Sequence, residues 1–269
     1  MLYVMKKYLA ITKIEMSRQL THRFNVLSYR VGNLIEVLIP LIIWTVAFRS
    51  ADVIKGYTYD EMVTYVVVGW LILYLTASYG FERVLALLIY DGTLSQFITK
   101  PISFLRYAFT LGFSRSLLAI LLSLAIQAGV IFIARDHIVF RAGLLDALIL
   151  ILMVAMAVVI RLFYSILISL AAFWTDEISG ADFTASSIIK FFSGAFFPIN
   201  LLPAFFMNFS LATPFIYTYY FPVQIVLGKV SARQAAEGLI AELLWIFIMY
   251  AIIKIVWRAG LKKYESVGI

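Results

Sequence analysis

The sequence has no cysteine and few charged residues, and each shortage excludes a class of protein. Without cysteine the chain forms no disulfide, no thiolate nucleophile and no cysteine-ligated metal site. Charged residues make up only 14% of the 269 residues, hydrophobic residues make up 63%, and the mean hydropathy is +0.97. Because soluble domains are about 45–50% apolar and about 25% charged, this composition excludes an ordinary soluble domain. A GxxxxGK[ST] phosphate-binding loop is also missing, so the chain does not bind ATP in that manner.

Long hydrophobic segments predict an all-α integral membrane protein with one transmembrane domain over residues 1–269. A helix needs about 20 apolar residues to cross a bilayer. Six segments meet or approach that length, and polar or broken connections separate them. The predicted spans are approximately 31–48, 62–81, 107–134, 144–174, 185–198 and 238–256.

The first 30 residues predict an amphipathic elbow helix over 3–29 that lies on the membrane surface. Leu9, Met16 and Leu20 fall on one face of this helix, together with Leu2 and Leu27. Lys7, Arg18 and Asn25 fall on the opposite face. The alternative interpretation is a basic tail with only local helix.

The segment 191–228 is hydrophobic but is interrupted by Gly194, Pro198, Pro203, Pro214 and Pro222. Proline removes a backbone donor and clashes with the preceding helical turn, so we expect the fifth span to end near Pro198. The remainder is too apolar for a solvated loop and too broken for a span. Two short re-entrant helices, about 201–211 and 216–226, would fit in an outer region over 198–228. The alternative is an interfacial loop rich in aromatic residues.

Basic residues predict the orientation of the chain in the membrane. Fourteen Lys and Arg residues fall in the two termini and the connections 82–106 and 175–190, whereas six fall in the opposite loops. The positive-inside rule therefore places both termini in the cytoplasm, and membrane orientation accounts for the net charge of +7 without a nucleic-acid partner. The two histidines, His22 and His137, then lie on opposite faces, so we expect no metal site.

Glu36 and Arg161 stand out as charges inside predicted spans. A central arginine costs about 2.5–3.5 kcal/mol on insertion scales, so a partner or a wet cavity is expected. The two residues could form a structural pair, or they could serve as a proton relay or a site for an anionic substrate. Arg115 and Lys190 lie close enough to the cytoplasmic ends of their helices to snorkel.

The cytoplasmic segment 82–106 contains signals for a small helix. Asp91-Gly92 predicts a turn, Thr93 is placed to cap a short helix through Phe97, and Lys100-Pro101 would end it. Such a helix could bind a partner, or it could be a plain helical connection. The residues alone favour neither interpretation.

Nearly the whole chain resembles the ABC-2 type permeases, the membrane subunits of a class of ATP-binding-cassette exporters. The resemblance rests on the six-span plan with an elbow, on DGTLSQFITKPIS over 91–103, and on GAFFPINLLP…PFIYTYYFP…G over 194–228. It implies a transport subunit that is not itself an enzyme and carries no cofactor of its own. It also implies a multi-pass protein of the cell (inner or plasma) membrane, in contact with membrane lipid. ATP and Mg²⁺ would bind two separate ATPase subunits, and a second permease, either this chain or a paralogue, would complete a dimer.

The resemblance also assigns two groups of candidate residues. The coupling region that docks on the ATPase would comprise Asp91, Gly92, Thr93, Leu94, Ser95, Phe97, Lys100 and Pro101. The outer gate would comprise Gly194, Pro198, Leu202, Pro203, Pro214, Phe215 and Pro222. Two other functions are considered. One is a stand-alone secondary transporter with Glu36 and Arg161 on its ion or proton path, and the other is a membrane assembly protein without transport.

Overall fold

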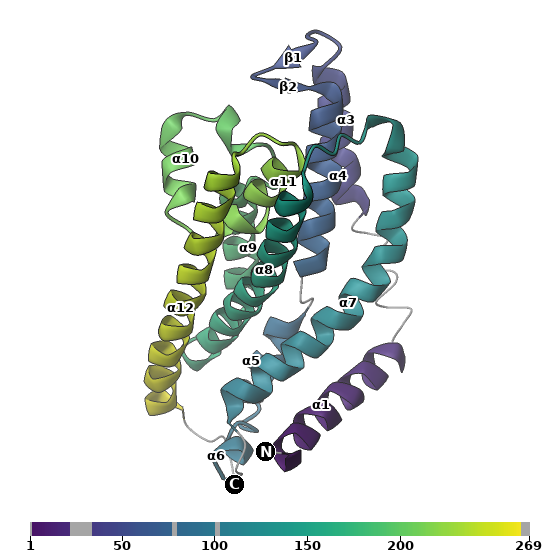
Figure 1. The fold of residues 1–269 in the computed structure, drawn as a ribbon. Coiled ribbons are helices and arrows are strands. Elements are labelled where there is room, and N and C mark those ends of the chain that lie inside the picture. The colour runs from purple at the N-terminus through teal and green to yellow at the C-terminus, as the bar shows by residue number, and fades with distance from the viewer. Residues whose placement is uncertain (1, 22–33, 77–79, 100–102, 265–269) are drawn as a thin grey trace.

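The computed structural model describes residues 2–21, 34–76, 80–99 and 103–264, and it is almost entirely helical in these ranges (Figure 1). In the first half, the elements are α1 (Leu2–Thr21), α3 (Leu34–Ala47), β1 (Val53–Ile54), β2 (Tyr57–Thr58), α4 (Tyr59–Thr76), α5 (Phe81–Tyr90), α6 (Ser95–Thr99) and α7 (Phe104–Ala134). In the second half, they are η1 (Arg135–His137), α8 (Leu144–Leu170), η2 (Ala171–Phe173), α9 (Ser179–Ser193), η3 (Ile199–Leu201), α10 (Ala204–Leu211), η4 (Phe215–Thr218), α11 (Tyr220–Val226) and α12 (Ala232–Lys263).

Long apolar helices form the body of the molecule and establish its class. In the parts of the chain that the structure describes, Leu144–Phe173 and Ala232–Lys263 are long and apolar enough to cross a membrane. So is the stretch Tyr59–Tyr90, of which residues 77–79 lie outside the described ranges. The helix α7 has a comparable length of 31 residues. The all-α membrane class is therefore confirmed. In contrast, α3 and α9 have only 14 and 15 residues, below the roughly 20 that a full span needs, so six complete spans remain a prediction.

The predicted elbow coincides in part with α1, while residues 22–29 lie outside the described ranges. Two polar contacts fasten α1 to α7. Glu15 pairs with Arg115 at 2.9 Å, and the Ser114 hydroxyl donates to Thr12 Oγ1 at 2.9 Å. Arg115 is thus held by a carboxylate rather than snorkelling freely. Leu9, on the predicted apolar stripe, is 63% exposed and faces away from the body, as a lipid-facing residue would.

The boundaries of α9 differ from the prediction. The helix begins at Ser179 rather than near 185, and it ends at Ser193, with Gly194 as its C-cap, rather than near Pro198. Gly194 has φ of +85°, a conformation that glycine adopts without strain, and Ala195 donates its N–H to the carbonyl of Lys190 at 3.0 Å. The glycine, and not the proline, therefore terminates this helix.

The last helix is longer than the apolar segment that predicts it. Ser231 and Gln234 form a capping box, so α12 begins at Ala232, before the predicted span 238–256 starts. Arg233 and Glu237 form an exposed pair one turn apart on the first two turns. A hydrophobicity criterion overlooks such a solvated helical end.

A two-stranded hairpin, which the sequence analysis did not predict, precedes α4. Val53 pairs with Thr58 and Ile54 with Tyr57. Both turn residues, Lys55 and Gly56, have positive φ, as a two-residue hairpin loop of the I′ type requires. The hairpin and α10 lie at one end of the molecule, and α6 lies at the other end with the N-terminal end of α1 (Figure 1).

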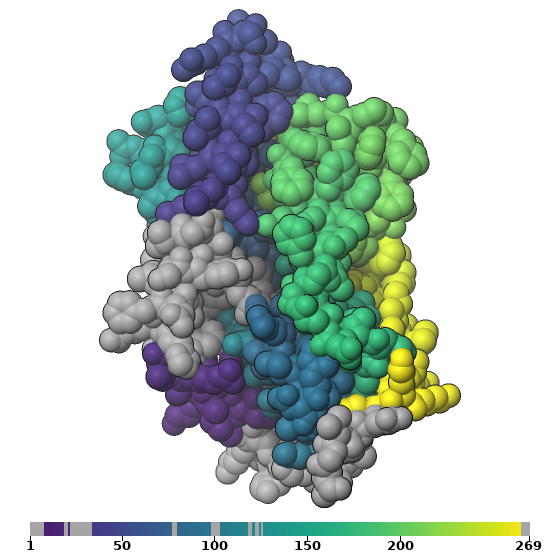
Figure 2. Space-filling view, turned by 180° about the vertical axis from the view of Figure 1, so that it is seen from behind, coloured from purple at the N-terminus to yellow at the C-terminus, as the bar shows by residue number. Residues whose placement is uncertain are grey.

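Three buried clusters hold the described helices together. The smallest joins α3 to α4 and includes Val37, Val66, Trp70 and Tyr74. One of the two larger clusters lies among α5, α7, α8 and α12 and includes Phe81, Leu85, Phe104, Leu170 and Phe173. The second lies among α4, α8, η4 and α11, toward the end with the hairpin, and includes Tyr57, Met62, Met153, Ile216 and Val223. The molecule seen from behind, in Figure 2, has a furrow between α3 and the region of α9 and α10.

Candidate functional site

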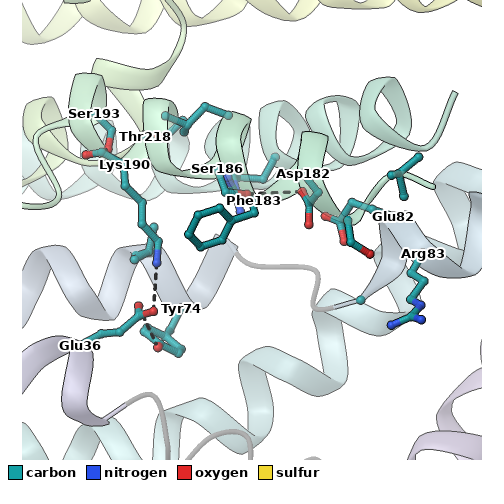
Figure 3. A pocket seen from close by; sticks show the side chains of 16 residues that line it. Glu36, Tyr74, Glu82, Arg83, Asp182, Phe183, Ser186, Lys190, Ser193 and Thr218 are labelled. Atoms are coloured by element: carbon teal, nitrogen blue, oxygen red, sulfur yellow. Dashed lines mark hydrogen bonds and ion pairs between the residues drawn. The ribbon is translucent and has the colours of Figure 1, made fainter. Parts of the chain in front are cut away.

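A cavity of about 530 Å³ lies among α3, α4, α5, α8, α9 and η4 (Figure 3). Both charged residues singled out from the sequence, Glu36 and Arg161, line it. The lining also includes Glu82, Arg83, Asp182, Phe183, Ser186 and Lys190. Its size falls within the range of about 300–1,000 Å³ that is usual for small-molecule sites.

Glu36 and Arg161 do not pair with each other. The Glu36 carboxylate pairs with Lys190 Nζ at 3.0 Å, and it also accepts a hydrogen bond from the Tyr74 hydroxyl at 3.4 Å. Lys190 therefore extends across the cavity from α9 to α3 instead of snorkelling to a helix end (Figure 3). No local sequence pattern predicts this pairing, because the two residues are 154 positions apart.

Arg161 lies at the middle of α8, in another part of the cavity lining. Its guanidinium is 5.2 Å from the centre of the Tyr164 ring, a cation–π distance. Its Nε is buried without a hydrogen-bond partner, and among the described residues no carboxylate lies within 4 Å of the side chain. Glu82 accepts a hydrogen bond from Ser165. Asp182 accepts long hydrogen bonds of 3.4 Å from Tyr164 and Ser186.

A second cavity of about 220 Å³ adjoins the first, and both are lined by Glu36, Leu73 and Lys190. It extends to Ala195 and Phe196, directly after the turn at Gly194. The Glu36–Lys190 pair thus lies where the two cavities meet. Together the cavities form a row from the start of α5 to the end of α9.

The predicted coupling region forms a tight turn followed by α6. Gly92 has φ of +71°, and Leu94 donates its N–H back to the carbonyl of Leu88 at 2.8 Å. Thr93 is predicted to cap the short helix, but it does not. The turn directs its hydroxyl to the same Leu88 carbonyl at 3.2 Å. The hydroxyl therefore helps to close the end of α5.

The exposed part of this turn is smaller than the predicted residue set. Leu94 is fully buried, and Phe97 packs its ring against Phe104 and Tyr107. Asp91 and Gln96 are exposed, whereas Ser95 is half-buried and donates its hydroxyl to the carbonyl of Gly92. Lys100 and Pro101 lie outside the described residues. A partner would touch Asp91 and Gln96, while Leu94 supports them from below.

The predicted outer gate residues mark the breaks between short helices. Gly194 ends α9, Pro198 and Leu202 flank η3, and Pro203 precedes α10. Pro214 precedes η4, which begins with Phe215, and Pro222 lies within the buried helix α11. The two short helices that the prolines predict are thus confirmed. Their re-entry into a membrane, and their role as a gate, remain predictions.

A polar cluster that the sequence analysis missed fastens this region to the hairpin. The buried Glu61 carboxylate pairs with Arg141 at 2.6 Å and with Lys229 at 2.8 Å, and so joins the start of α4 to the connections that precede α8 and α12. The Tyr57 hydroxyl donates to Asn200 at 3.0 Å and accepts from Gln224 at 2.7 Å. Burial raises the pKa of Tyr57 above its usual value, so the phenol stays neutral.

Glu242 is a further charge that the sequence analysis missed, although it falls inside the predicted sixth span. Its side chain is fully buried on α12, and neither carboxylate oxygen has a hydrogen-bond partner among the described residues. An unpartnered buried carboxyl group is costly and in membrane proteins is commonly functional. Glu242 is therefore a second intramembrane candidate besides the cavity.

The fold and the site define an all-α integral membrane protein whose helices line a cavity with charges of both signs. A family model described as ABC-2 family transporter protein matches residues 34–268, so the chain belongs to the ABC-2 transporter family. The resemblance is therefore confirmed, and the chain is a membrane component of a transporter. No curated protein matches the chain.

Proposed function

We propose that the chain is the permease subunit of an ATP-driven exporter in the cell membrane, with both termini in the cytoplasm. A second permease completes the translocation path, and two ATPase subunits dock below on the turn at 91–97. The observation that carries the proposal is family membership over residues 34–268, together with the exposed turn of Asp91 and Gln96 at the end opposite the hairpin.

The two adjoining cavities support a path along α3 and α9. They run from Glu82, in the first turn of the helix α5 that leads to the coupling turn, to Phe196 beside the proposed outer gate. The Glu36–Lys190 pair is the constriction between them. In this scheme, ATP binding to the partner subunits moves the turn at 91–97, and the displaced α5 changes the cavity that it lines. The driving free energy comes from the differential affinity of ATP for the two states of the partner.

The docking surface is tested by co-purification from the native host. The tagged, detergent-solubilised chain is compared with the double variant Asp91→Lys plus Gln96→Lys, which alters exposed side chains alone. Asp52→Lys plus Asn208→Lys, also exposed but at the other end, is the matched control. Recovery of an ATPase with the native chain and the control, and its loss with the double variant, supports the proposal. Recovery of the folded chain without any ATPase refutes it.

A stand-alone secondary transporter is the second candidate function, and the buried carboxyl group of Glu242 is the observation that favours it. Glu36 pairs with Lys190 and not with Arg161, so Glu242 is the better candidate for a proton site. Transport into proteoliposomes that depends on a pH gradient, persists without any ATPase and is lost in Glu242→Gln would establish this alternative.

A further inference from the structure

The charges that line the larger cavity are balanced, and this balance carries information about the ligand. Three side chains are acidic and three are basic: Glu36, Glu82 and Asp182, and Arg83, Arg161 and Lys190. Glu36 and Lys190 neutralise each other at 3.0 Å. Charges of both signs remain near the start of α5, and no ion pair within 4 Å joins them among the described residues.

Arg161 provides the recognition element for an anion. Among the described residues, no carboxylate lies within ion-pair distance of its guanidinium, and its buried Nε has no hydrogen-bond partner. A guanidinium presents a planar fork of donors that matches a phosphate or a carboxylate. Because an arginine in a membrane domain is costly unless it is partnered, an anionic ligand group would supply the missing interaction.

Glu82 and Asp182 provide the complementary element for a cation. Among the described residues, the side chains that donate to them are neutral hydroxyl groups: Ser165 to Glu82, and Tyr164 and Ser186 to Asp182. Both carboxylates therefore lack a cation within ion-pair distance among the described residues. An ammonium group beside them would be attracted to both carboxylates.

The remaining lining is apolar. Phe183 is 75% exposed and lies between the Glu36–Lys190 pair and the carboxylates of Glu82 and Asp182 (Figure 3). Leu73 and Ile189 line the cavity with it. Such an exposed phenylalanine offers an apolar surface to a ligand, and the cavity volume suits a headgroup with part of a chain.

We propose, on the basis of the transport function above, that the cavity binds a zwitterionic amphiphile. Its anionic phosphate or carboxylate contacts Arg161, its ammonium lies beside Asp182 and Glu82, and its apolar part packs on Phe183. A phospholipid headgroup and a soluble zwitterion share this chemistry.

Three probes that share a dodecyl group but differ in charge test the charge requirement: dodecylphosphocholine, dodecyl phosphate and dodecyltrimethylammonium. Binding of each to the full chain in a nonionic maltoside is counted by native mass spectrometry. We expect the zwitterion to bind in a 1:1 ratio and more tightly than either singly charged probe. Equal binding of all three probes would overturn the inference.

Two variants test the anion-binding and the cation-binding parts of the site separately. Arg161→Gln weakens binding of the zwitterion and the anion by about tenfold or more and spares the cation, since a charged hydrogen bond is lost. Asp182→Asn weakens binding of the zwitterion and the cation and spares the anion. Arg258→Gln, exposed on α12 outside the cavity, changes neither. Arg161→Lys keeps the charge without the fork and gives intermediate binding. Unchanged binding in Arg161→Gln and Asp182→Asn would refute the site.

Competition identifies the source of the ligand. Displacement of dodecylphosphocholine by phosphatidylethanolamine assigns a lipid headgroup, whereas displacement by glycerophosphoethanolamine alone assigns a soluble zwitterion. Displacement by neither compound contradicts the proposal. Co-purification of the ATPase is measured with the same variants. If the ATPase is retained while the probes bind without charge preference, the ligand inference fails and the proposed permease function stands.

Discussion

The hydroxyl of Tyr264 donates a hydrogen bond to the carbonyl oxygen of Gly92, over a distance of 2.6 Å. This contact joins the residue that follows α12 to the turn between α5 and α6. Its neighbourhood is tightly packed, because Phe173 contacts the Tyr264 ring edge-on and leaves no room for a side chain at Gly260. The C-terminal end of α12 therefore holds the proposed docking turn in place.

We predict that Tyr264→Phe weakens coupling more than it weakens the fold. Loss of one hydrogen bond costs about 1 kcal/mol of stability, but it releases the Gly92 turn from α12. The expected result is a lower transport rate for each ATP hydrolysed, measured in proteoliposomes with the partner ATPase. Tyr250→Phe is the control. Tyr250 is exposed on α12, and no hydrogen bond of its hydroxyl is seen among the described residues. Equal effects of the two substitutions would argue against a coupling role.

The Glu61 cluster gives a prediction about stability. Glu61→Gln removes the charge that pairs with Arg141 and Lys229, and Arg141 is more than half exposed, so we expect a loss of about 1–3 kcal/mol. Glu237→Gln breaks an exposed pair and should cost less than about 1 kcal/mol. Thermal unfolding in detergent measures both. Indistinguishable midpoints for the two variants would contradict the proposed fastening of the hairpin to the outer region.

Gly194 and Gly129 form a matched pair of glycines. Gly194 has φ of +85°, and a Cβ there would lie 2.7 Å from the Tyr65 hydroxyl oxygen, so Gly194→Ala should cost about 1–3 kcal/mol. Gly129 lies within α7 with no atom near its Cβ position, so Gly129→Ala should be neutral or stabilise by up to about 1 kcal/mol. The order of the two unfolding midpoints is the measurement, and a stable Gly194→Ala variant would show that the turn is not required.

The Glu36–Lys190 pair gives a prediction about the path. Glu36→Lys or Lys190→Glu alone places two like charges at the constriction and should lower transport, whereas the charge-swapped double variant should restore it. Initial transport rates of the three variants at equal protein levels measure this. A double variant no better than either single variant would exclude a direct interaction in the working protein.

The sequence predicts the elements that depend on local signals. Apolar length predicts the helices near 62–81, 107–134 and 144–174, and proline spacing predicts the short helices α10 and α11. Long-range pairing is not contained in such signals. The Lys190–Glu36, Arg115–Glu15 and Tyr264–Gly92 contacts join positions that only the fold brings together. Glu242 could have been found from the sequence, because a single acid inside an apolar segment is itself a signal.

The remaining differences between prediction and structure arise where contacts in the fold override the preference of a residue type. Thr93 has the residue type of a helix cap, but the positive φ of Gly92 turns its hydroxyl back to α5. Leu94 looks like a contact residue in a loop, yet it fills the buried cluster under the turn. A substitution such as Leu94→Asp would therefore report on folding rather than on docking, which is why the docking tests use Asp91 and Gln96.

The central claim is that a separate ATPase docks at the turn of residues 91–97, and site-specific photo-crosslinking in native membranes tests it most directly. A photoreactive residue replaces the exposed Gln96 in one variant and the exposed Asn208 in another. We predict a crosslink from position 96 to a protein that carries a phosphate-binding GxxxxGK[ST] loop, and none from position 208. Crosslinks from position 96 to lipid alone, with the chain folded and inserted, would contradict the account.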